Sequence, residues 1–249
     1  MNLFLIIIIL ISTSYPVYYY TSQIPKHRFG PGPHRVQMEV QMEDRSYAQF
    51  TIQMHDLDKM PHSVNLFLQQ VYHGLWDETS FVINAPHILQ AGTLPVSGSG
   101  KTYDEKMEEF EKMGLSQVSF QEYHRDYSHK EWTVGFAGRP GGPDFYINKM
   151  DNSKNHGPGG QKHHDLKEEA DPCFGYISEG KDTLHKVFGL NTGAMEHSFI
   201  LDKPVHIHRA IILDLGSKKT DTSSHGLKDL HFDFDEEYED FPEVEKSAI

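Results

Sequence analysis

The chain is rich in histidine, a side chain that binds metals and exchanges protons near neutral pH, with 17 among its 249 residues. His206 and His208 alternate within VHIHRAIILDLG, which predicts a strand with both imidazoles on one face. Such a pair can begin a metal site if a carboxylate and a third histidine converge on it. No H-E-x-x-H motif supports that site, and the alternative is a strand whose imidazoles face solvent while Val205 and Ile207 face the core.

Cys173 is the one cysteine of the chain, so no intrachain disulfide can form. A catalytic thiolate needs a partnered histidine and an electropositive setting, and the neighbours Phe174 and Gly175 supply neither. We therefore expect Cys173 to be a buried core residue and not a nucleophile.

The stretch WTVGFAGRPGGPDFYI, residues 132–147, places two apolar segments on either side of a Gly/Pro-rich bend. Asp144 is followed at once by the aromatic residues Phe145 and Tyr146, and Arg139 lies in the bend. Two strands joined by a turn are predicted here. They form either the wall of a binding site or a hairpin that only closes the core.

The rest of the pattern is mostly strands, with two helices far apart in sequence. Residues 36–43 and 47–56 alternate as a hairpin, Pro61 opens a helix that Gly74 ends, and Asp182 is placed to cap the second helix. A charged insertion over residues 93–118 can hold one short helix, and residues 151–170 read as a polar surface loop. The expected strands are 36–43, 47–56, 80–84, 87–92, 131–138, 143–150, 173–180 and 205–216. This order predicts a mainly β fold, a closed antiparallel eight-stranded barrel capped by two helices.

The first twenty residues contain nine consecutive apolar residues, LFLIIIILI, which suit the core of a signal peptide. Extended to Tyr20, the run approaches the length of a membrane span. We expect a cleaved signal peptide or a single membrane anchor over residues 1–20, and hence a protein of the secretory pathway or a membrane-anchored one. A Pro/Gly-rich linker is expected over residues 21–34, before a domain over residues 35–216.

The net charge is −13, which repels a phosphate backbone, so a nucleic-acid partner is not expected. Residues 217–249 include the acidic run DFDEEYEDFPEVE and show little hydrophobic periodicity. We expect them to form a solvated, disordered tail.

Five blocks follow one another as they do in the cyclophilin family: FTIQMHD, MPHSVNLFLQQV, HILQAG, WTVGFAG with DFYI, and DPCFGYISEGKDTLHKVFG. Over about residues 36–215 the chain therefore resembles a cyclophilin. The resemblance implies a peptidyl-prolyl cis-trans isomerase barrel without a cofactor, whose partner is a proline-containing peptide or protein segment. Rotation about the bond before proline faces a barrier of ~18–20 kcal/mol. The family lowers it with an arginine that donates towards the substrate's proline, beside a hydrophobic pocket for the ring.

Carried over residue by residue, the resemblance gives Gln90 as the family's chain-holding glutamine and Tyr146 as the aromatic of the proline pocket. Ala137 keeps its place in the strand before the bend.

Five positions depart from the family pattern. The arginine position falls on Val82, whose isopropyl group has no donor. The pocket phenylalanine, the strand asparagine, the bend glutamine and the histidine before the F-G pair become His87, Phe136, Asp144 and Asp171. Arg139 is the one candidate for a replacement donor.

The sequence therefore predicts a cyclophilin-like domain that binds proline-containing peptides, with isomerase activity lost or strongly reduced. A non-catalytic structural or interaction module, in which the acidic tail is the working part, is one alternative. A histidine-rich metal-binding barrel is the other.

Overall fold

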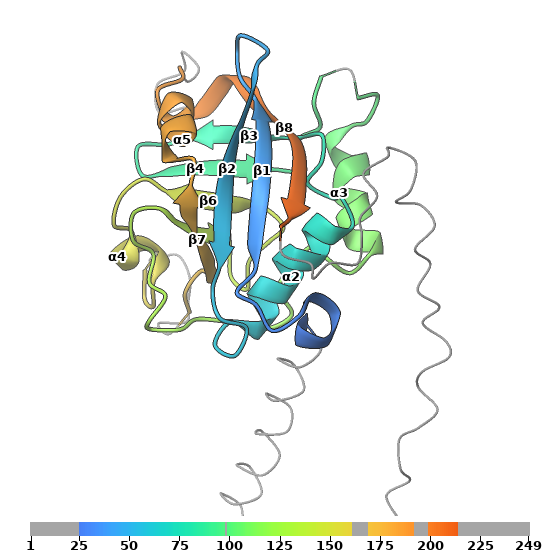
Figure 1. Cartoon of the computed structure of the whole chain (residues 1–249). Helices are drawn as coiled ribbons and strands as arrows, with labels where there is room; N and C mark the ends of the chain where they lie inside the picture. The colour runs from blue at the N-terminus through green and yellow to red at the C-terminus, as the bar shows by residue number, and fades with distance from the viewer. Residues whose placement is uncertain (1–24, 98, 161–168, 192–198, 214–249) are drawn as a thin grey trace, which may run out of the picture. The chain divides into compact units, whose positions relative to one another are not determined.

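The structure is a computed structural model that describes residues 25–97, 99–160, 169–191 and 199–213 (Figure 1). The expected signal or anchor over residues 1–20 and the acidic tail over residues 217–249 lie outside the described residues. No helix within the described ranges is long and apolar enough to cross a membrane. By its internal contacts the chain divides into two units, Met1–Leu215 and Gly216–Ile249, and the barrel belongs to the first.

Eight strands close into an antiparallel barrel in the order β1-β2-β7-β5-β6-β4-β3-β8, which confirms the predicted fold (Figure 1). Closure gives every strand two neighbours and leaves no exposed sheet edge. The strands are β1 (Arg35–Gln41), β2 (Tyr47–Met54), β3 (Thr79–Asn84), β4 (Ile88–Gly92), β5 (Thr133–Phe136), β6 (Phe145–Asn148), β7 (Cys173–Glu179) and β8 (Ile200–Ile212).

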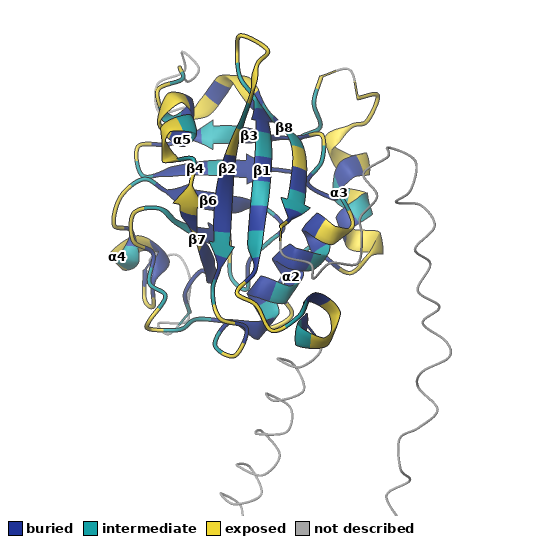
Figure 2. Cartoon of the chain, in the orientation of Figure 1, coloured by how far each residue is buried: buried dark blue, intermediate teal, exposed yellow. Residues whose placement is uncertain are grey.

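The alternation of apolar and polar residues in β1 decides which face turns inward. Val36, Met38 and Val40 are fully buried, and the residues between them are only half-buried. Figure 2 shows this alternation of dark blue and teal along β1. Because side chains alternate across a strand, this pattern fixes the register of β1 against β2 and β8.

Helices cover the barrel: α2 (Pro61–Tyr72), α3 (Tyr103–Lys112), the single turn α4 (Ser153–His156) and α5 (Lys181–Phe188). The predicted helices correspond to α2 and α5, which lie at the lower and upper ends of the barrel in Figure 1. The α2 amides of His62 and Ser63 donate to the buried carboxylate of Glu122, at 2.9 and 2.7 Å. Met60, the N-cap residue of α2, makes no side-chain hydrogen bond to the helix. Glu122 therefore supplies the acceptor for backbone amides at the start of α2.

The barrel core is aromatic, and α2 delivers its central ring. Phe67 lies 4.7 Å from Phe174, 5.3 Å from Phe145 and 6.2 Å from Phe136, measured between ring centroids. Trp76, which follows α2, lies 4.7 Å from Phe145. These ring contacts pack α2 against β5, β6 and β7. They hold the three strands in fixed positions, and so also the side chains on the outer face of each strand.

Several local expectations differ from the structure. Residues 25–34, expected as linker, are packed: residues 25–29 are helical and Phe29 is buried against Tyr72, 6.0 Å away between centroids. Residue Gly180, not Asp182, is the N-cap of α5, because its φ of +79° lets the chain reverse there. The loop expected over residues 151–170 contains α4, whose His156 is buried and not exposed.

Candidate peptide-binding site

Three of the predicted site residues meet on the outer wall of the barrel, around Gly92 at the end of β4. The Gln90 side-chain amide donates to an Asp144 carboxylate oxygen at 3.1 Å. A methyl group added at Gly92 would lie 3.4 Å from both Val82 Cγ2 and Asp144 Oδ2. The ladders β3–β4 and β4–β6 place them there, since Ser80 pairs with Gly92 and Ala91 with Phe145. The resemblance therefore identified a real spatial group.

This group lacks a cation. Burial raises the pKa of Asp144, and hydrogen bonds from Gln90 and from the Thr93 amide offset only part of that rise. Val82, at the position of the family's arginine, presents only methyl groups beside this carboxyl. Nothing in this corner can donate a charge-assisted hydrogen bond to the nitrogen of a twisting prolyl bond.

The neighbouring wall is a packed polar network centred on Asp171. Its carboxylate accepts from three side chains: Tyr146 Oη at 3.0 Å, His156 Nδ1 at 2.6 Å and Arg139 Nε at 2.9 Å. Burial alone would raise the pKa of Asp171, but the bonds from His156, Arg139 and Tyr146 outweigh it and hold the pKa below its usual value. Asp171 is therefore an ionised anchor and not a side chain facing a peptide.

His129 completes the network from behind Tyr146. Its Nε2 lies 2.9 Å from the Asp171 carbonyl, which can only accept, so Nε2 carries the proton. Its Nδ1 lies 3.3 Å from Tyr146 Oη, whose single hydroxyl hydrogen is donated to the Asp171 carboxylate. Burial lowers the pKa of His129 to about 4 and raises that of Tyr146 above its usual value. Both groups are neutral at pH 7.

Arg139 does not reach the groove, contrary to the expectation that it could replace the missing donor. Its side chain is fully buried and also donates to the carbonyls of Gly160 at 3.0 Å and Gly157 at 3.4 Å. With all three guanidinium nitrogens engaged, the side chain fastens the bend to the α4 segment. Arg139 is a structural residue.

The aromatic wall expected to hold a proline ring is covered. Tyr146 is 1% exposed, and the ring of His156 lies 4.6 Å from it between centroids. His156 also stacks at 5.9 Å on His87, the residue at the position of the pocket phenylalanine. His156 therefore packs on both Tyr146 and His87, the two residues that the resemblance assigns to the proline pocket.

Phe136 and Ala137 take structural roles in the hairpin. Phe136 is fully buried and packs at 4.5 Å on Phe174, so its side chain points into the barrel and not towards a peptide. The Ala137 amide donates to the Asp144 carbonyl at 2.8 Å, and the Ala137 carbonyl accepts from Gly142 at 3.0 Å. The amide and the carbonyl of Ala137 are therefore both hydrogen-bonded within the bend. The hairpin interpretation of residues 132–147 holds for these two residues.

Cys173 is buried, as predicted, and burial raises the pKa of its thiol to about 12. The thiol stays protonated at neutral pH and is not a nucleophile.

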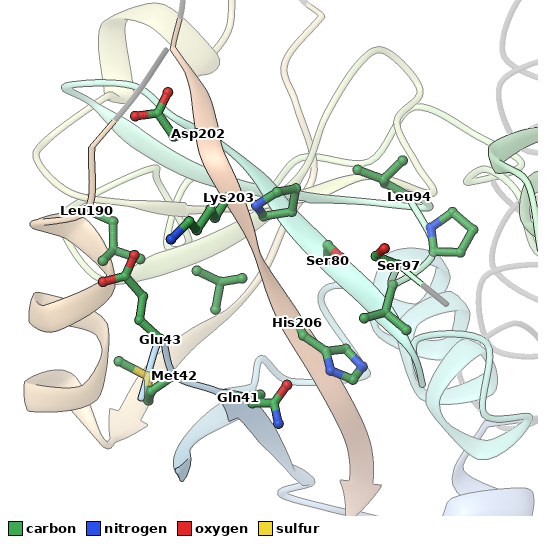
Figure 3. Close-up of a pocket in the computed structure, with 14 residues that line it drawn as sticks. Gln41, Met42, Glu43, Ser80, Leu94, Ser97, Leu190, Asp202, Lys203 and His206 are labelled. Atoms are coloured by element: carbon green, nitrogen blue, oxygen red, sulfur yellow. The ribbon is translucent and has the colours of Figure 1, made fainter. Parts of the chain in front are cut away.

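The sequence did not single out His129 and His156 as members of this wall. His156 lies in a polar, Gly-rich stretch, and no periodicity marks it as buried. A surface depression does occur elsewhere, beside β8, with Gln41, Ser80, Leu94, Asp202 and His206 among its lining residues (Figure 3).

The buried pair of Arg139 and Asp171 should be essential for stability. We expect Arg139→Leu to lower the free energy of unfolding by about 3–5 kcal/mol, because it leaves a buried carboxylate without its charged partner. Lys59→Leu, which removes the exposed pair with Asp126 at 2.8 Å, should cost at most about 1 kcal/mol. Denaturant unfolding of both variants measures the difference, and equal losses would contradict the role given to Asp171.

Buried His129 should make the fold sensitive to acid. Its pKa is about 4 in the folded chain and 6.5 in the unfolded one, so the unfolded state binds more protons between these values. Stability should fall as the pH drops from about 6.5 towards 4, by about 3 kcal/mol from this residue. The variant His129→Gln should show a shallower decline in unfolding free energy between pH 7 and 5. A decline as steep as that of the native chain would show that His129 is not its source.

None of the curated proteins compared with the chain matches it. Among solved structures, the cyclophilin type peptidyl-prolyl cis-trans isomerase cgd2_1660 of Cryptosporidium parvum is similar in fold, with a TM-score of 0.50 and 14% identity. The similarity covers 72% of this chain and 98% of that one. The family model described as "Cyclophilin type peptidyl-prolyl cis-trans isomerase/CLD" matches residues 36–211, most of the chain. The chain therefore belongs to the cyclophilin-type peptidyl-prolyl cis-trans isomerase family.

Proposed function

We propose that this cyclophilin-family domain binds proline-containing segments with little or no isomerase turnover. One observation carries the proposal: Val82 stands where the family has an arginine, next to a wall already filled by His156, Tyr146 and Asp171. Catalysis of prolyl rotation requires stabilisation of the twisted bond beyond that of the ground state. Without a donor aimed at the nitrogen, and without a pocket to hold the ring, neither part of that stabilisation is supplied.

The surface left for binding is the half-buried corner of Val82, Gln90 and Asp144, with His87 and Ala137 at its margins. Gln90 offers an amide, and Val82 with the partly buried Ile83 offers apolar area. Proline-containing segments are pre-extended and lose little entropy on binding. A shallow corner of this kind supports weak binding of one side of a proline-containing segment.

The isomerase assay tests the catalytic half of the proposal. The full-length protein should leave the cis-to-trans rate of an Xaa-Pro peptide at its uncatalysed value, while an active cyclophilin in the same buffer accelerates it. The variant Val82→Arg should remain inactive, because a guanidinium alone does not open the wall above Tyr146. Turnover by the native chain would overturn the proposal. Turnover by Val82→Arg alone would show that the pocket is open and that the missing donor is the only defect.

A peptide titration tests the binding half. Adding a proline-containing tetrapeptide to the ¹⁵N-labelled full-length protein should shift the amides of Val82, Gln90 and Asp144. Gln90→Ala should weaken this binding, because it removes the only neutral amide of the corner. The matched control Gln69→Ala, on α2, should leave it unchanged. No shifts at all, or equal affinity in the Gln90→Ala protein, would contradict binding at this corner.

A further inference from the structure

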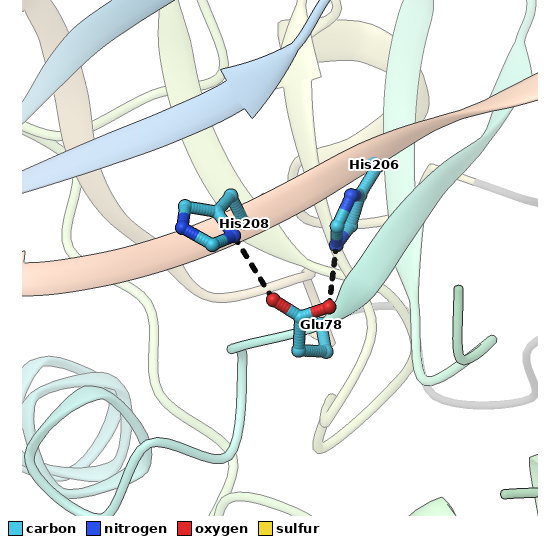
Figure 4. Close-up of side chains that lie close together, drawn as sticks. All are labelled: Glu78, His206 and His208. Atoms are coloured by element: carbon cyan, nitrogen blue, oxygen red, sulfur yellow. Dashed lines mark hydrogen bonds and ion pairs between the residues drawn. The ribbon is translucent and has the colours of Figure 1, made fainter. Parts of the chain in front are cut away.

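Three side chains that could ligate a metal converge on the outside of the barrel, and none of them belongs to the peptide-binding corner. His206 Nε2 lies 3.1 Å from one carboxylate oxygen of Glu78, and His208 Nδ1 lies 3.0 Å from the other (Figure 4). One ligand atom from each residue lies within 4.8 Å of the other two. A single ion can therefore contact all three side chains.

The barrel itself creates this convergence. In the ladder between β3 and β8, Ser80 pairs with His206 and Thr79 with Ile207, which brings Glu78, just before β3, alongside His208. Ile207 is fully buried, so the two histidines share the outer face, as their alternation predicts. Glu78 adopts a φ of +60°, a left-handed conformation uncommon for a residue other than glycine. The backbone thus turns sharply at the point where the carboxylate meets both imidazoles.

The ligand set and its spacing suit zinc. Two histidines with one carboxylate form a known zinc ligand set, with bond lengths of about 2.0–2.2 Å. Ligands on a tetrahedron of that size lie about 3.3 Å apart. The observed separations of 3.0 and 3.1 Å end on the two different oxygens of Glu78, so one of them is already close to this edge length when a single oxygen binds. The remaining ligand atom lies within 4.8 Å of the others, and side-chain rotation would bring it onto the ion.

Binding of an ion would give His206 an interaction that its present neighbours do not provide. Both of its ring nitrogens are buried and neither has a partner with hydrogen-bond geometry, although Nε2 is near Glu78. Burial of ring nitrogens without hydrogen bonds destabilises the folded state, and ligation of an ion by Nε2 would offset this cost.

An outer layer is present around His208. If Nδ1 binds the ion, the other ring nitrogen, Nε2, faces the Glu39 carboxylate at 3.9 Å. Gln49 donates to the same carboxylate at 2.8 Å and so orients it. Histidines that bind metals commonly have such a carboxylate partner, which fixes their tautomer.

We propose that Glu78, His206 and His208 bind one divalent transition-metal ion, zinc in the first instance, with Glu39 as the outer partner of His208. Three protein ligands leave a fourth tetrahedral position for water or for a ligand atom of another molecule. The depression beside β8 is lined by His206 and gives access to this side of the barrel (Figure 3). The sequence analysis required a carboxylate and a third histidine beside this pair, and among the described residues the structure supplies the carboxylate, Glu78, and no third histidine.

The test is zinc binding by the full-length, tag-free protein after chelator treatment. Equilibrium dialysis and calorimetry should give one tight equivalent of Zn²⁺ per chain. Co²⁺ in its place should give the visible absorption of a tetrahedral site. Glu78→Gln and His206→Gln should each abolish that equivalent, and Glu39→Gln should weaken it by about 10–100-fold.

Matched controls separate this site from the many other histidines. His73→Gln and His185→Gln change exposed imidazoles and should keep the tight equivalent. Circular dichroism and thermal unfolding without metal check that each variant is folded, and zinc should raise the melting temperature only where Glu78 and His206 are intact. The absence of a tight equivalent, or undiminished binding in folded Glu78→Gln protein, would overturn the proposal.

Discussion

The carboxylate of Asp171 is the point on which the outer wall of this barrel depends. It accepts hydrogen bonds from Arg139, His156 and Tyr146, which come from the bend, the α4 segment and β6. A buried anion is tolerated only when such donors replace water. Three separate segments are therefore bound to the one carboxylate of Asp171. The side chains of these segments pack together and form the wall.

The same requirement bears on the proposed loss of isomerase turnover. A prolyl isomerase of this family needs an arginine free to donate to a substrate and an aromatic pocket free to hold a ring. Here the nearby arginine, Arg139, is fully engaged in structural hydrogen bonds, and the aromatic residue Tyr146 is covered by His156. The barrel of the family is retained, and Arg139 and Tyr146 contribute to its stability through their bonds to Asp171.

The outer face of β8 carries the proposed metal site. Strand pairing brings Glu78 beside two histidines, and no residue of the Asp171 network takes part. A site on the ladder between β3 and β8 can change independently of the wall near β6, since each rests on its own strand register. Metal binding at the proposed site would therefore not depend on isomerase activity elsewhere on the barrel.

The sequence determined the barrel and the family. Alternation in β1 and β2, the Pro61 start and Gly74 end of α2, and the order of the five blocks are local signals, and each matches the structure. The resemblance to the family also grouped Gln90, Asp144 and Val82, and the pairing of β4 with β3 and β6 brings them together. Local patterns put His206 and His208 on one face, since a strand has a period of two.

Only the tertiary structure decided what those side chains meet. Arg139 and Asp171 are 32 positions apart, and Glu78 and His208 are 130 apart, so no local pattern links either pair. The burial of His156 in a polar stretch and the helical packing of residues 25–29 depend equally on distant partners. The packing of the whole wall determines which polar groups are desolvated. A desolvated arginine such as Arg139 must form hydrogen bonds within the protein, and it then anchors a loop.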